Sequence, residues 1–136
     1  ASKYALEALS EAVAIETKRF GIRVIVIEPG FILTPILDKA GEVEIGDGPY
    51  APHLRRMKVL YRDARGGADP PSVVAVVIAD ALVDPNPRFR YLAGEGAPPV
   101  INGRARVTDE EWIDLGREMT DEEYFKESGR RLPQPG

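Results

Sequence analysis

The run Ile22–Ile27, with the letters IRVIVI, constrains the fold of this chain more than any other feature. Five of its six residues are isoleucine or valine, and only Arg23 interrupts them. Such a β-branched run is typical of a strand that is buried on both faces of a parallel sheet. Gly21 precedes the run and the turn formers Pro29 and Gly30 follow it, so we expect a short strand with defined ends.

A helix is predicted before this strand. Residues 1–20 are rich in Ala, Leu and Glu, which are good helix formers, and Gly21 is a natural helix stop. Over half of the circumference is apolar or small, which is more than a helix packed on one side needs. We therefore expect this helix to be covered twice, by a sheet and by another helix. Glu7 and Glu11 share a narrow face with Lys18, and we expect that face to be solvated.

The middle of the chain predicts one more helix and one more strand. Residues 31–68 are expected to be irregular, with a short basic helix around Leu54–Tyr61. A buried helix is expected from residue 70, with Asp69 as its N-cap and proline in its first turn. The letters RFRYLAG predict a final strand that Gly94 closes. Helix, glycine and buried strand in this order favour an α/β layered fold.

The end of the chain changes character. The letters TDEEW and TDEEY each match a capping box, which pairs Thr108 with Glu111 and Thr120 with Glu123. The expected helices cover about residues 109–118 and 121–128. Trp112, Tyr124 and Phe125 are interpreted as anchors that dock these helices.

Composition narrows the classes of function. The 136 residues are the size of one ordinary domain, and their net charge of −4 argues against nucleic acid as the main partner. The absence of cysteine excludes disulfides and thiolate metal sites, and His53 has no acidic residue at ligand spacing, so no metal is expected. No apolar run approaches the ~20 residues that span a bilayer, so no membrane partner is predicted and a cytoplasmic location is expected.

Three segments in a fixed order carry a resemblance to a known family: ASK at 1–3, PGFILTP at 29–35 and PRFRYLAG at 87–94. In this order, and separated by the elements described above, they resemble the C-terminal half of the short-chain dehydrogenase/reductase family. The resemblance covers roughly residues 1–94. It implies an α/β fold that is part of a doubly wound, Rossmann-type parallel sheet.

The resemblance also divides the chain. Residues 1–94 would form the C-terminal half of a Rossmann-type dehydrogenase domain, within which residues 35–68 would be the substrate-binding loop. Residues 95–136 match no family motif, and we expect a short helical extension and tail.

Members of this family interconvert alcohols and carbonyl compounds, with NAD or NADP as the cofactor and a Tyr-x-x-x-Lys pair as the proton-transfer machinery. Lys3 matches the lysine, and the tyrosine would stand two positions before Ala1. The chain is accordingly expected to be a partial sequence, cut after the catalytic tyrosine and inactive by itself. Its Gly-rich phosphate loop would lie upstream.

The resemblance assigns roles to further residues. The expected catalytic residue is Lys3, and the expected cofactor-binding residues are Lys3, Pro29, Gly30, Ile32 and Thr34. The expected walls of the pocket for a small alcohol or carbonyl substrate are Ile36, Leu37, Tyr50, Leu54 and Met57. A homo-oligomer, dimer or tetramer, is expected through the helix at residues 1–20.

The sequence is also compatible with other functions. An epimerase or dehydratase of the wider family would use the same chemistry on a sugar nucleotide. A non-catalytic binding or oligomerisation module would have kept the scaffold alone. The basic residues Arg55, Arg56, Lys58, Arg62 and Arg65 form either a solvated face or a contact for an acidic substrate or a cofactor phosphate.

Overall fold

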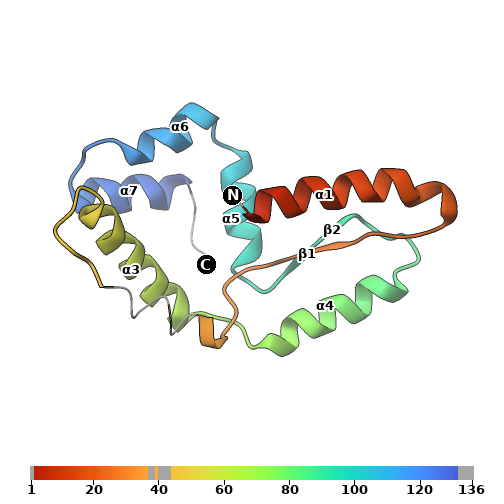
Figure 1. The fold of residues 1–136 in the computed structure, drawn as a ribbon. Helices are drawn as coiled ribbons and strands as arrows, with labels where there is room; N and C mark the ends of the chain where they lie inside the picture. Colours follow the sequence, from red (N-terminus) through yellow and green to blue (C-terminus); the bar gives the residue numbers. More distant parts are fainter. Residues whose placement is uncertain (1, 37–38, 40–43, 132–136) are drawn as a thin grey trace.

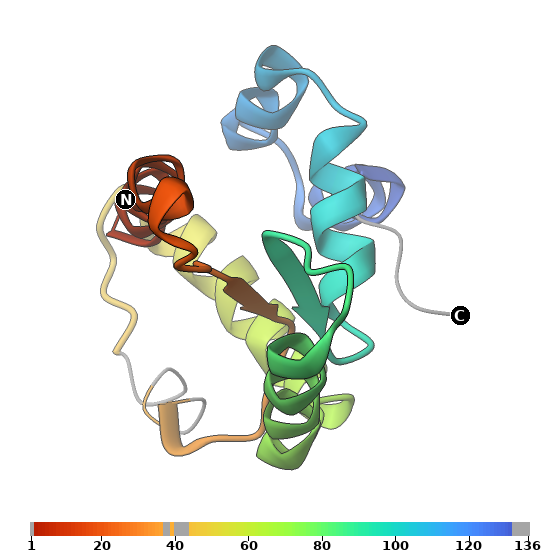
Figure 2. The same cartoon turned by 90° about the vertical axis from the view of Figure 1, so that its right-hand side faces the viewer.

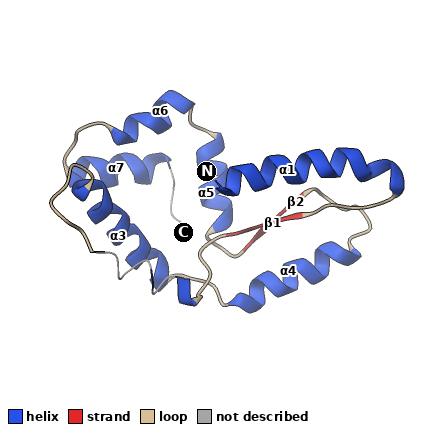
Figure 3. Cartoon of the chain, viewed as in Figure 1, coloured by secondary structure: helices blue, strands red, loops and turns tan. Residues whose placement is uncertain are grey.

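The computed structural model of the chain describes residues 2–36, 39 and 44–131, and its helices and strands are drawn in Figures 1 and 3. Its strands are β1 (Val26–Pro29) and β2 (Arg90–Ala93). Its α-helices are α1 (Ser2–Thr17), α3 (Ala51–Gly66), α4 (Pro71–Val83), α5 (Ala97–Ala105), α6 (Asp109–Ile113) and α7 (Asp121–Arg131). Two 3₁₀ turns are η1 (Lys18–Phe20) and η2 (Asp114–Gly116).

Strands β1 and β2 pair in parallel, with Val26 opposite Arg90 and Pro29 opposite Ala93. Helices α1 and α4 lie on opposite sides of this sheet (Figures 1 and 2). This arrangement confirms an α/β fold with a parallel sheet, and it is consistent with part of a Rossmann-like architecture. Among the described residues, no helix is long and apolar enough to cross a membrane.

The predicted strand at Ile22–Ile27 was wrong in its boundaries. The ladder begins where the N–H of Val26 donates to the carbonyl of Phe89 at 2.8 Å, and β1 then continues to Pro29. The sequence predicted a strand from apolar character, whereas a strand needs a hydrogen-bonded neighbour. The ladder with β2 starts only at Val26, so the backbone of the four residues before it has no neighbouring strand among the described residues.

The predicted double cover of the first helix was also wrong for this chain. None of the described residues of α1 is buried, and the side chains of Tyr4 and Ile15 are 77% and 72% exposed. The predicted stop was confirmed, because Gly21 has a φ of 72° and its N–H donates to the carbonyl of Lys18. The sequence therefore predicted the helix and its end correctly, but not its neighbours.

Part of the acidic face of α1 contacts the sheet. The expectation that this face is solvated was therefore wrong for half-buried Glu7, whereas Glu11 and Lys18 are exposed. The guanidinium of Arg90 on β2 pairs with Glu7 at 3.1 Å and with Glu11 at 3.5 Å. Burial raises the pKa of Glu28 on β1, nearby Glu7 adds to this rise, and Arg90 opposes it. The hydrogen bond that Arg90 donates to Glu7 in turn raises the pKa of Arg90.

The middle helices are longer or start differently than predicted. Helix α3 covers Ala51–Gly66 rather than Leu54–Tyr61, because Pro52 suits its first turn and Gly67 follows its end. Exposed His53 lies in its first turn. Helix α4 forms where expected, but its N-cap residue is Pro70, so the assignment of Asp69 as N-cap was wrong. The prediction that this helix is buried was also wrong, because Ala81 is the only buried residue of the described helix and Val83 is 79% exposed.

The C-terminal extension is helical, as predicted, and it contains one helix that the sequence did not reveal. Helix α5 begins with Ala97, which two prolines follow, and prolines fit the first turn of a helix but are also helix breakers further along it. Both capping boxes are confirmed, and the hydroxyls of Thr108 and Thr120 accept from backbone N–H groups at 3.1 and 3.2 Å. The buried apolar residues lie around β2 and where α3 meets α7: Ala51, Ala81, Tyr91, Ala93, Ala97 and Tyr124.

Candidate functional site

The candidate site lies where the two parallel strands end. The N–H of Gly30 donates to the carbonyl of Ala93 at 2.9 Å, so the ends of β1 and β2 are held in line. The chain then turns at Gly94, which has a φ of 85°, and enters α5. Ligands of open α/β sheets bind outside the carboxyl ends of the strands, so this edge is the expected place of a ligand-binding site.

Gly30 has a structural requirement for glycine. A Cβ at this position would lie 2.5 Å from the nitrogen of Ala97 and 2.8 Å from the carbonyl carbon of Gly96. Both atoms are backbone and cannot rotate away. The backbone that approaches Gly30 in this chain is the start of α5.

Asp69 fixes the segment that follows Gly30. Its N–H donates to the carbonyl of Phe31 at 2.9 Å, and its carbonyl accepts from the N–H of Leu33 at 2.8 Å. Its carboxylate accepts from the N–H of Glu95 at 2.8 Å. Asp69 therefore forms a parallel bridge with Ile32 by bonding to the residues on either side of it. In such a bridge the N–H and C=O of Ile32 point away from Asp69. Within the described chain no hydrogen bond occupies those two groups.

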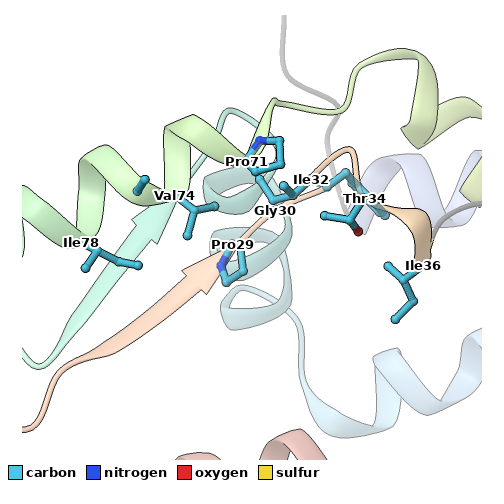
Figure 4. Close-up of a pocket in the computed structure, with 10 residues that line it drawn as sticks. Pro29, Gly30, Ile32, Thr34, Ile36, Pro71, Val74 and Ile78 are labelled. Carbon is cyan, nitrogen blue, oxygen red and sulfur yellow. The ribbon is translucent and has the colours of Figure 1, made fainter.

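A hollow of about 550 Å³ opens beside this segment, between it and the first half of α4 (Figure 4). It brings together five of the predicted site residues: Pro29, Gly30, Ile32, Thr34 and Ile36. The remaining lining residues are Phe31, Pro71, Val74, Ala75 and Ile78. Thr34 supplies the only polar side chain among these ten, so the hollow suits an apolar group that presents one polar edge.

Lys3 lies in the first turn of α1 and is exposed. In Figure 1 this helix begins at the end of the sheet where β1 and β2 finish. Lys3 is not part of the lining of the hollow. The arrangement therefore puts the predicted catalytic lysine and the predicted cofactor segment at the same end of the sheet.

The predicted substrate residues divide into two groups. Ile36 lines the hollow, whereas Leu37 falls outside the described residues. Tyr50 directly precedes α3 and is 76% exposed. Leu54 and Met57 lie on α3, and Met57 is half-buried. The lining of the hollow, taken over the described residues, does not include these three.

Asp69 is the residue of this site that sequence reasoning missed. Its position before two prolines indicated only a helix cap. The carboxylate of Asp69 has room beside residue 94 because that residue is glycine, and a Cβ there would lie 2.4 Å from the carboxylate. The carboxylate then accepts a hydrogen bond from the N–H of Glu95. These partners lie about 25 residues further along the chain, and no local pattern connects them. In the part of the chain that the structure describes, no group of three or more His, Cys, Asp or Glu could hold a metal ion.

No family profile matches the chain. Comparison with curated proteins finds several oxidoreductases. Two uncharacterized oxidoreductases of Schizosaccharomyces pombe are 33% identical over 122 residues, which covers 87% of this chain and 50% of each relative. The 3-ketodihydrosphingosine reductase of Bacteroides thetaiotaomicron is 34% identical over 97 residues, 69% of this chain and 36% of that protein. Human 17-beta-hydroxysteroid dehydrogenase type 1 is 32% identical over 118 residues, 80% of this chain and 34% of that protein.

The chain belongs to the short-chain dehydrogenase/reductase family. It spans half the length of the two Schizosaccharomyces pombe relatives and about a third of the length of the other two. This coverage is consistent with the C-terminal half that the sequence motifs indicated.

Proposed function

We propose that the protein containing this chain is an NAD- or NADP-dependent oxidoreductase that interconverts alcohols and carbonyl compounds by hydride transfer. The observation that carries the proposal is the segment Pro29–Thr34, which leaves the end of a parallel strand and lines a hollow there. The relatives named as oxidoreductases, reductases and dehydrogenases support the same class of activity.

The residues around the hollow fit a nicotinamide ring. The apolar walls formed by Pro29, Val74 and Ile78 suit the faces of a planar ring. The outward N–H and C=O of Ile32 and the hydroxyl of Thr34 suit the donor and acceptor groups of a carboxamide. When bound, the nicotinamide would supply the hydride acceptor or donor.

Lys3 would act through a tyrosine two positions before Ala1. Residues four apart on a helix share a face, so the ammonium would lie near the phenol. A nearby positive charge favours the phenolate and lowers the tyrosine pKa from about 10 toward the working pH. The phenol could then exchange a proton with the substrate oxygen, and Lys3 would also donate to the hydroxyls of the nicotinamide ribose.

Two further parts of the chain have proposed roles. Ile36, Tyr50, Leu54 and Met57 would contribute to an apolar substrate wall, together with Leu37. A second copy of the protein would cover the apolar side of α1. The exposed apolar residues of α1 support this second role, since a monomer gains nothing from leaving them in water: Tyr4, Leu6, Leu9, Val13 and Ile15.

A lysine substitution tests the catalytic proposal in the native protein that contains this chain. Lys3→Met should lower kcat/KM for carbonyl reduction by about 100-fold or more, because the proton donor loses its charged support. Lys18→Met is the matched control, because Lys18 is exposed in η1 at the other end of the same helical segment. Wild-type kcat/KM in Lys3→Met, or an equal loss in Lys18→Met, would contradict the assigned role.

A further inference from the structure

Arg56 is buried although it is charged. It lies on α3, within the predicted substrate-binding loop, and only 9% of its surface is exposed. A guanidinium is costly to remove from water unless its donors are paired. The partners of Arg56 therefore decide what it does. For this residue they exclude the solvated role that the sequence left open, whereas Arg55 and Arg62 are exposed.

Among the described residues, the hydrogen-bond and ring partners of Arg56 come from one short segment of the C-terminal extension. Its Nε donates to the carboxylate of Asp121 at 2.8 Å, and its Nη2 donates to the carbonyl of Met119. Its guanidinium carbon lies 4.8 Å from the centre of the Tyr124 ring. Tyr124 is itself 7% exposed and packs edge-to-face against Phe125 at 5.5 Å.

The segment that receives Arg56 begins with a capping box. Thr120 and Glu123 form a reciprocal capping box at the start of α7, with N–H to oxygen distances of 2.8 and 3.2 Å. The backbone N–H and hydroxyl of Thr120 hold the pKa of Glu123 below its usual range, so this carboxylate stays charged at neutral pH. Arg56 therefore joins α3 to the capped start of α7, and these two segments lie more than 60 residues apart in sequence but side by side in Figure 1.

The geometry suits arginine and no other residue. Arginine combines a planar fork of donors with a face that stacks on an aromatic ring, and the three contacts of Arg56 use both properties. A lysine here would keep the charge and one donor but would lose the second donor and most of the stacking. The neighbouring Arg55 is exposed, so the same helix offers a basic residue outside this arrangement.

We propose that Arg56 is a positioning residue through which the C-terminal extension sets the place of α3, and with it the substrate selectivity of the enzyme. The proposal rests on the proposed function, because it takes α3 as part of the substrate-binding loop. Leu54 lies two residues before Arg56 on α3 and Met57 directly follows it, so a displaced Arg56 displaces both proposed wall residues. Cofactor binding involves the separate segment Pro29–Thr34 and should not depend on Arg56.

The test compares Arg56→Gln, Arg56→Lys and Asp121→Asn with Arg55→Gln in the native protein. We expect Arg56→Gln to raise KM for a bulky ketone by about five-fold or more, with kcat and NAD(P)H affinity within about two-fold. Arg56→Lys should recover part of this loss, and Asp121→Asn should give a smaller change in the same direction. Arg55→Gln should leave KM unchanged.

Hydrogen–deuterium exchange without substrate supplies a second readout. In Arg56→Gln, peptides from α3 and from the start of α7 should exchange faster, while α4 peptides keep their wild-type rate. Unchanged exchange in α3, or a fall in kcat with an unchanged KM, overturns the proposal. If the wild-type protein shows no NAD(P)-dependent turnover, the proposed function is overturned. The positioning role of Arg56 is then still tested, because the hydrogen–deuterium exchange rate of α3 shows whether Arg56 holds this helix. Asp121→Asn keeps the test decisive if Arg56→Gln does not fold.

Discussion

Replacing Gly30 with alanine tests how tightly the candidate site is built. The new Cβ would lie 2.5 Å from the nitrogen of Ala97, whereas ordinary contacts begin at 3.4 Å, so the start of α5 must retreat by about 0.9 Å. Neither Ala97 nor Gly96 can relieve this overlap by a rotamer change, because the atoms are backbone. Overpacking of this kind costs about 1–3 kcal/mol, which outweighs the roughly 0.4–1 kcal/mol that alanine gains by restricting the unfolded chain.

Urea unfolding of the native protein measures this change, with Gly66→Ala as the matched control. At Gly66, the last residue of α3, a Cβ would meet nothing within 4 Å. Gly66→Ala should therefore raise the free energy of unfolding by about 0.4–1 kcal/mol, while Gly30→Ala should lower it by about 1–2 kcal/mol at an unchanged m-value. If both substitutions stabilise the protein equally, the close approach of α5 to Gly30 is refuted.

Two further predictions concern pH. Tyr91→Phe should cost about 1–2 kcal/mol, because the buried hydroxyl accepts from the N–H of Arg88 and donates to Asp84, each at 2.9 Å. The pKa of Asp84 is lowered by the N–H of Asn86 and by this hydroxyl, so the stabilisation is present above about pH 4 and should shrink as acid protonates Asp84. Urea titrations between pH 3 and pH 7 would show this, and a constant difference would contradict it. The pKa of Glu28 is raised, so its ionisation disfavours the fold, and Glu28→Gln should gain stability relative to wild type as pH rises from about 4. A gain that is independent of pH would contradict that cause.

Features that depend on neighbouring residues were predictable from the sequence. The helix stop at Gly21 needs only one residue that tolerates a positive φ, which is 72° here. The capping boxes at Thr108 and Thr120 need only an acidic residue three positions later. The parallel strand pair followed from an apolar run and an alternating segment, although the ladder begins later than the apolar run does.

Features that depend on distant residues were not predictable. Glu7 and Arg90 are 83 residues apart and Arg56 and Asp121 are 65 apart, so no periodic pattern relates them. The sequence therefore did not reveal the carboxylate partner of either arginine, and it predicted that the acidic face of α1 faces solvent.

The candidate site falls between these cases. The family resemblance selected Pro29, Gly30, Ile32 and Thr34, and these four line one hollow. The support that holds them was not visible in the sequence, because Asp69 acts through a bridge to Ile32 and a bond to the N–H of Glu95.

Transfer of deuterium from cofactor to substrate tests the central claim most directly. The native protein is incubated with NADH or NADPH that carries deuterium at the reactive carbon of the nicotinamide, together with a panel of ketones, and the alcohols are analysed by mass spectrometry. The account predicts an alcohol one mass unit heavier, with deuterium at the former carbonyl carbon, and much less of it from Lys3→Met. An unlabelled product, or no product with any ketone while both cofactors still bind, would contradict it.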